Sequence, residues 1–153
     1  MTDQTDIITS RLDGYLDALS LMIGKFREYR YFSYLVDIKE SELEESLSLL
    51  YQRHKGEVTF ERLINVSPWL KFIQTNIEER LKTIVSGDND RIYQAAWYIV
   101  EMIEQLNNYE TPESIYTCSY KYSCDGKCSI GTLYVVPVKN QQLIINMLRE
   151  NSA

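Results

Sequence analysis

The chain has 153 residues, of which 44% are hydrophobic and 25% are charged, and its net charge is −6. These are ordinary values for a globular protein, and they exclude an intrinsically disordered chain. No apolar run approaches the ~20 residues that a membrane-spanning helix needs. The polar start MTDQTDIITS does not resemble a secretory signal. We therefore expect a single soluble domain over residues 1–153, cytoplasmic and without contact to a membrane.

The acidic residues are concentrated in two segments, 37–64 and 88–110, whereas segments 65–87 and 111–153 are slightly basic. Broad nucleic-acid binding needs clustered Lys and Arg that release counterions from the phosphates. The net charge argues against such binding. An acidic surface suits a basic protein partner better than a phosphate backbone.

Residues 7–36 repeat with the spacing of an amphipathic helix. The apolar positions alternate in steps of four and three, the a/d pattern of a coiled-coil-like seam: Ile8, Leu12, Tyr15, Leu19, Met22, Phe26 and Tyr29. Such a seam either pairs with a second copy, which predicts a homodimer, or packs inside the chain's own core. The sequence leaves both alternatives open.

The next segments also show helical spacing, and four helices are expected, over about 41–54, 59–64, 67–86 and 88–107. Ser41 and Glu44 have the spacing of a capping box, and Ser67-Pro68 is a typical helix start. In the last of these helices a second apolar patch lies about 100° from the core stripe. Tyr93, Trp97 and Val100 form this patch, which is typical of a central helix or of a partner surface.

After Thr111-Pro112 the apolar period changes from 3.6 to 2, which predicts a β-hairpin over residues 114–138. A three-residue loop over 125–127 would pair Cys124 with Cys128 and place the mostly apolar even-numbered residues on one face. Residues 140–150 are expected to form a short final helix. The predicted fold is therefore mainly α: a bundle of four to five helices over residues 5–108, closed by the hairpin and that helix.

The three cysteines, Cys118, Cys124 and Cys128, are the first candidates for a metal site. Zinc needs four ligands that converge on one point, but six strand residues, about 20 Å, separate Cys118 from Cys124. We therefore expect no metal. An odd number of cysteines favours a reducing compartment, although Cys124 and Cys128 could form a disulfide under oxidation.

The sequence contains no recognisable catalytic or cofactor-binding motif. The only histidine, His54, has no nucleophile in a recognisable setting, and there is neither a G-x-G-x-x-G nor a Walker loop. We therefore expect neither an enzyme nor a cofactor.

Residues 57–84 faintly suggest a helix-turn-helix, with the hairpin as a wing, which defines an alternative function. In this winged-helix-like, DNA-binding transcriptional regulator the contact residues would be Lys71, Gln74, Thr75, Lys82, Lys121 and Lys127.

The preferred hypothesis is a non-enzymatic regulatory or inhibitory protein that binds a protein partner through an acidic or aromatic surface. Its candidate interface comprises Tyr93, Trp97, Val100, Leu19, Met22 and Phe26.

Overall fold

The computed structural model describes residues 4–23, 29–52, 57–67, 69–82, 89–110, 114–124, 127–139 and 141–151. Its elements in chain order are α1 (Gln4–Ile23), β1 (Tyr29–Val36), the 3-10 turn η1 (Glu40–Glu42), α2 (Leu43–Gln52), β2 (Glu57–Phe60), β3 (Ile64–Val66), α3 (Trp69–Lys82), α4 (Asn89–Leu106), β4 (Ile115–Cys124), β5 (Lys127–Val138) and β6 (Gln141–Asn151). Helices α2, α3 and α4 lie close to where the sequence predicts them. The prediction of a mainly α helical bundle is wrong, because a sheet forms the centre of the fold.

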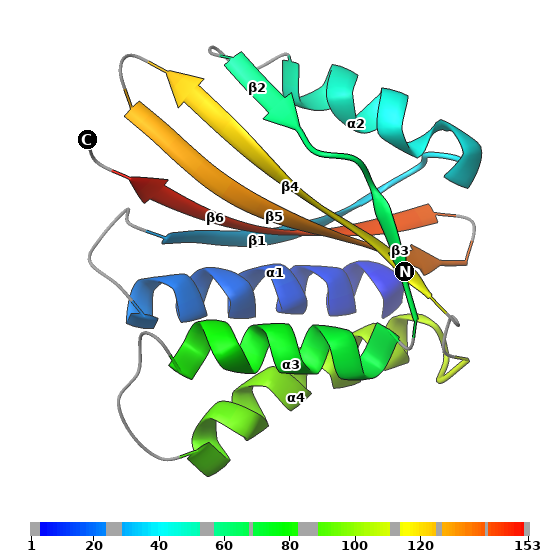
Figure 1. The fold of residues 1–153 in the computed structure, drawn as a ribbon. Coiled ribbons are helices and arrows are strands. Elements are labelled where there is room, and N and C mark those ends of the chain that lie inside the picture. Colours follow the sequence, from blue (N-terminus) through cyan, green and yellow to red (C-terminus); the bar gives the residue numbers. More distant parts are fainter. Residues whose placement is uncertain are drawn as a thin grey trace.

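The strands form one six-stranded antiparallel sheet in the order β1-β6-β5-β4-β2, with β3 also paired to β4 (Figure 1). The last strand, β6, is inserted between β1 and β5 and pairs with β1 from Tyr29↔Arg149 to Val36↔Gln142. The first and last strands of the sequence are therefore neighbours in the sheet, and β1 forms one edge of it.

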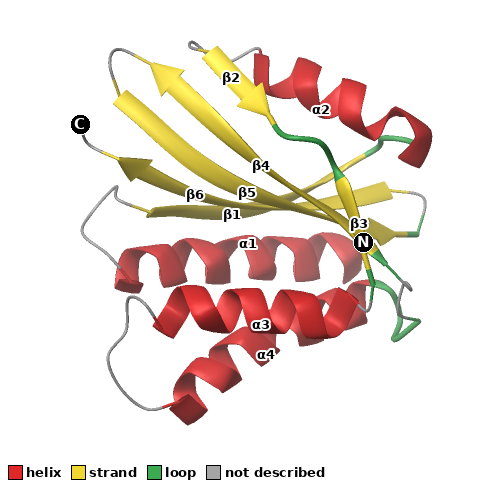
Figure 2. Ribbon diagram, viewed as in Figure 1, coloured by secondary structure: helices red, strands yellow, loops and turns green. Residues whose placement is uncertain are grey.

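Helices cover both faces of the sheet, unequally (Figure 2). Helices α1, α3 and α4 lie on one face, here called the helical face, and α2 lies on the other, here called the α2 face. The core of the helical face includes Leu12, Leu16, Ile77, Ile99, Ile103, Tyr134 and Ile145. The smaller core of the α2 face includes Leu43, Leu47, Cys118, Tyr120, Leu133, Val135 and Ile144.

Residues 141–151 form the strand β6 and not the final helix predicted over 140–150. Every residue from Leu143 to Met147 is buried, and the apolar ones enter the two cores alternately. A central strand covered on both faces is apolar at consecutive positions, so its periodicity cannot be distinguished from that of a short buried helix. The neighbouring β-branched residues Ile144 and Ile145 favour the strand.

The predicted hairpin is present as β4 and β5, but the predicted register is wrong. Two residues, 125–126, separate the strands, so Cys124 pairs with Lys127 and Ser123 pairs with Cys128. Even-numbered residues of β4 consequently share a face with odd-numbered residues of β5. The prediction assumed one buried face, whereas both faces of this sheet are covered, and β5 therefore supplies apolar side chains to both cores.

The long helix predicted over residues 7–36 is divided into α1 and β1. In β1, Tyr31 and Ser33 are buried, while the intervening Phe32 is only partly buried. The short helix predicted over 59–64 is also wrong, because β2 and β3 occupy this region. In both segments aromatic and β-branched residues favour the extended chain.

Helix α1 is held against both β1 and α4. Leu12 and Leu16 are fully buried in the core of the helical face. Tyr15 Oη donates a hydrogen bond of 3.1 Å to the carbonyl oxygen of Ala95, and its ring centroid lies 4.6 Å from that of Tyr98. The described apolar side chains of the α1 seam thus pack inside the core of their own chain.

Candidate functional site

Of the six residues predicted as a partner interface, the structure describes the side chains of three, and two of these are buried in the core. Leu19 is 8% exposed and Val100 is fully buried, both in the core of the helical face. Trp97 is 38% exposed on α4. The side chains of Tyr93 and Met22, and all of Phe26, lie outside the described part of the structure.

The residues predicted to contact DNA lie on helix α3 and on the strands β4 and β5 of the sheet. Gln74 Nε2 donates a hydrogen bond of 3.2 Å to Glu78 Oε1 on α3, and Thr75 and Lys82 of the same helix are exposed. Lys121 is exposed on β4, while the side chains of Lys71 and Lys127 are not described. The helix-turn-helix itself is wrong, because β2 and β3, and not a helix, precede α3.

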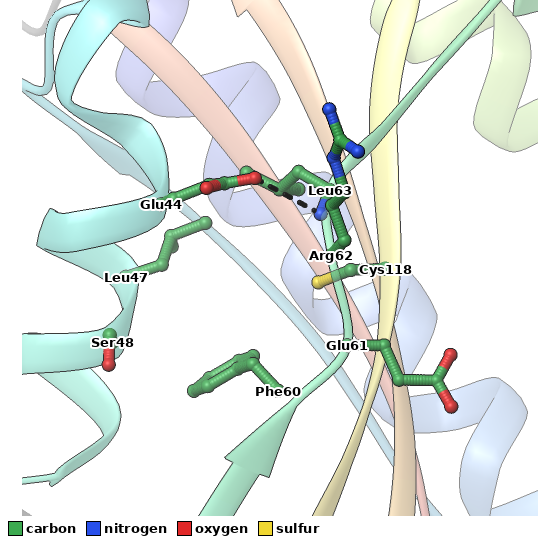
Figure 3. Close-up of a pocket in the computed structure, with 8 residues that line it drawn as sticks. All are labelled: Glu44, Leu47, Ser48, Phe60, Glu61, Arg62, Leu63 and Cys118. Atoms are coloured by element: carbon green, nitrogen blue, oxygen red, sulfur yellow. Dashed lines mark hydrogen bonds between the residues drawn. The ribbon is translucent and has the colours of Figure 1, made fainter.

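A first pocket, here called the thiol pocket, lies between α2 and the segment that joins β2 to β3 (Figure 3). Its volume is about 260 Å³, and its apolar lining comes from Leu47, Phe60 and Leu63. Glu44 Oε1 accepts a hydrogen bond of 3.3 Å from the backbone N–H of Leu63. Glu44, predicted as part of a capping box, therefore ties α2 to the β2–β3 segment.

The thiol of Cys118 lines this pocket, and its surroundings favour the protonated form. Cys118 is 5% exposed, and Figure 3 shows its sulfur directed towards Leu47 and Phe60. Burial, and to a smaller extent the carboxylates of Glu44 and Glu61, raises the pKa of this thiol from 9.0 to about 11. A nucleophilic or metal-binding cysteine needs its thiolate, so these surroundings oppose both uses. The pocket supplies packing for α2 and no evident chemistry.

A second groove, here called the edge groove, runs between α1 and the outer edge of β1. It has a volume of about 350 Å³ and is lined by Asp6, Thr9, Ser10 and Asp13 from α1 and by Ser33, Tyr34 and Leu35 from β1. Positions 6, 10 and 13 fall on one line of a helix because of its 3.6-residue period. The same period places the exposed carboxylate of Asp17 next along this line.

The edge groove contains two polar groups of particular interest. Asp13 Oδ1 accepts a hydrogen bond of 2.9 Å from the backbone N–H of Ser33. The Ser33 side chain is only 5% exposed, and its Oγ has no hydrogen-bond partner among the residues that the structure describes. A buried hydroxyl without a partner is unfavourable by about 1–3 kcal/mol, so its position beside a groove indicates that an added ligand could bind it.

The direction of the Ser33 N–H shows which backbone groups face the outer edge of β1. Because Ser33 donates to Asp13, its N–H points away from β6, and in an antiparallel pair the direction alternates along the strand. Ser33 and Leu35 therefore present their backbone groups outward, whereas Phe32 and Tyr34 face β6. Within the described residues, no strand pairs with this outer edge.

Sequence reasoning missed the edge groove because it assigned residues 29–36 to a helix. Two signals were present: the aromatic-rich run from Tyr29 to Tyr34, which favours a strand, and the seven-residue spacing of Asp6 and Asp13. Their juxtaposition depends on the reversal of the chain between α1 and β1.

Comparisons of the chain with family models, with curated proteins and with solved structures give no significant match. Among the described residues, no three Cys, His, Asp or Glu side chains converge as metal ligands. No described helix is both long enough and apolar enough to cross a membrane.

Proposed function

We propose that this chain is a non-enzymatic regulatory or inhibitory protein that binds a basic segment of a protein partner in the edge groove. The observation that supports this most strongly is the combination of acidic side chains on α1 with the edge of β1, which pairs with none of the strands that the structure describes. Proteins usually protect such an edge because it readily pairs with other chains.

The charges around the groove favour a cationic ligand. Asp6 and Asp13 line it, and Asp17 extends the acidic line along α1. The described lining of the groove contains no Lys or Arg; nearby, Lys139 Nζ donates a hydrogen bond of 3.3 Å to Thr5 Oγ1, and Arg30 is exposed on β1. Because the described lining carries the carboxylates of Asp6 and Asp13 and no cation, a Lys- or Arg-containing segment is attracted and an acidic one is repelled.

A peptide panel tests the proposal. The first probe alternates Lys and Val over seven residues, and the comparison peptide carries Asp in place of Lys. We expect the Lys peptide to bind at low ionic strength, measured by fluorescence anisotropy, and the Asp peptide not to bind. Affinity should fall as salt rises, because exposed charges are screened.

Two matched variants locate the binding. Asp6→Asn with Asp13→Asn removes two negative charges from the groove and keeps an amide oxygen that can accept the Ser33 hydrogen bond. Exposed ion pairs contribute about 0.2–1 kcal/mol each, so this variant should bind the Lys peptide about 5-fold more weakly. The control, Glu79→Gln with Glu101→Gln, removes equal charge from exposed positions on α3 and α4. If both variants lose affinity equally, or if neither peptide binds, the proposed site is wrong.

A further inference from the structure

We infer that the partner segment binds as an antiparallel strand added to β1, with basic residues facing α1 and apolar residues facing the α2 side. This inference rests on the proposed function, because it specifies how the edge groove holds its ligand. It makes the recognised pattern an alternation of Lys or Arg with apolar residues in an extended chain.

The first step of the argument is the geometry of the edge. Ser33 and Leu35 direct their backbone groups outward, and every pair in this sheet is antiparallel. An incoming strand that continues the pattern can bond these groups through its own N–H and C=O groups. β1 has eight residues, which is long enough to hold a strand of ordinary length.

The second step concerns Asp13, which now holds the Ser33 N–H. A carboxylate at this position blocks the edge to an ordinary strand, which is a known means of preventing unwanted pairing. A strand that brings a Lys or Arg beside Asp13 can replace the hydrogen bond between Asp13 and the Ser33 N–H with two new contacts. The cation pairs with the carboxylate, and a backbone carbonyl of the partner accepts the Ser33 hydrogen bond. A neutral strand has no group to compensate Asp13, so the block selects for a basic one.

The third step assigns the two faces of the added strand. Directly opposite residues of an antiparallel pair point to the same face. The residue opposite Ser33 therefore points towards α1, where Ser33 Oγ, Ser10 and the acidic line lie. Its neighbours point to the α2 side, where the rings of Phe32 and Tyr34 stack with centroids 6.1 Å apart at an angle of 17°. The partly buried Phe32 ring offers that side an apolar contact.

The orientation also determines which partner residues use their backbone groups. In antiparallel pairing the residue opposite an outward-facing residue of β1 donates and accepts the hydrogen bonds. These are the basic residues, because they share the α1 side with Ser33. The intervening apolar residues direct their N–H groups away from β1.

Backbone methylation of the alternating Lys–Val peptide distinguishes strand addition from binding by charge alone. One peptide carries N-methyl groups on two of its Lys residues, and the other carries them on two of its Val residues. Both retain the charge and composition of the parent. We expect methylation at Lys to weaken binding at least ~10-fold, since it removes hydrogen bonds to the edge, and methylation at Val to change it less than ~3-fold. A block peptide with all Lys preceding all Val should also bind at least ~10-fold more weakly.

The outcomes separate this inference from the proposed function. If the parent peptide binds in the groove and both methylated peptides bind equally well, charge alone holds it and strand addition is wrong. If methylation at Val is the damaging change, the strand is parallel and the antiparallel arrangement is wrong. If the parent peptide does not bind at all, the proposed function itself fails.

Discussion

A glycine in the middle of β5 makes room for the ring of Tyr120 from the neighbouring strand. Gly131 pairs with Tyr120, and a Cβ placed on Gly131 would overlap the tyrosine ring. Tyr120 is 3% exposed, and its Oη donates a hydrogen bond of 2.7 Å to Oδ1 of the fully buried Asn146 on β6. Gly131→Ala should therefore displace the ring and break this hydrogen bond.

The two effects give the size of the destabilisation. Inserting a methyl group into a packed core lowers the stability by about 1–3 kcal/mol, and loss of the buried hydrogen bond between Tyr120 and Asn146 lowers it by about 1 kcal/mol more. We expect Gly131→Ala to lower the free energy of unfolding by about 3 kcal/mol. At this chain length each kcal/mol shifts Tm by about 2–4 °C, so Tm should fall by about 10 °C.

Urea denaturation of a double-mutant cycle with Tyr120→Val tests the cause. Valine is too short to lie across Gly131, so in that background the added methyl group should change stability by less than ~1 kcal/mol. If Gly131→Ala is equally destabilising with Val at position 120, the ring is not the reason and the explanation is refuted.

Two further predictions concern the cysteines. The pKa of the Cys118 thiol is raised to about 11, so the folded state retains its proton longer than the unfolded state, and stability should decrease as pH rises from about 9 towards 11. Cys118→Val should flatten this slope in pH-dependent urea titrations, and an unchanged slope would contradict the assignment. The second prediction tests the register: Ser123→Cys combined with Cys124→Ser places two thiols opposite each other at positions 123 and 128, and mild oxidation should form this disulfide in full. Failure to form it, shown by thiol titration, would contradict the two-residue loop.

The sequence was sufficient to predict helices α2, α3 and α4. Their apolar residues recur with a 3.6-residue period, and Ser67-Pro68 predicts a helix start next to the first residue of α3. These signals are local, since they depend on neighbours within one or two turns.

The sequence predicted only the hairpin strands of the six-stranded sheet, because the pairing and burial of the other strands depend on residues far away in sequence. The run Leu143–Met147 is buried on both sides only because helices cover both faces of the sheet. In the first segment, Phe26 and Tyr29 continue the heptad spacing of α1 by coincidence, although Tyr29 already belongs to β1. A periodicity argument cannot detect such a change of element when the next apolar residue falls on the expected position.

The edge groove was beyond prediction for the same reason. Asp13 and Ser33 are twenty residues apart in sequence, and their hydrogen bond requires that α1 fold back along β1. The net charge predicted an acidic surface but not its place, and the basic partner remains a proposal. Of the patch expected on α4, Val100 is fully buried and Trp97 is 38% exposed.

Hydrogen exchange of individual amides, with and without the alternating Lys–Val peptide, tests the central claim most directly. Strand addition gives the outward-facing amide of Leu35 an acceptor from the partner and replaces Asp13 at the amide of Ser33. At saturating peptide the exchange of the Leu35 amide should therefore slow at least ~10-fold, and that of Ser33 should not become faster. The amides of Phe32 and Tyr34, which face β6, should change little. Protection confined to α4 around Trp97, with the exchange of Leu35 unchanged, would show that the partner binds elsewhere and would contradict the account.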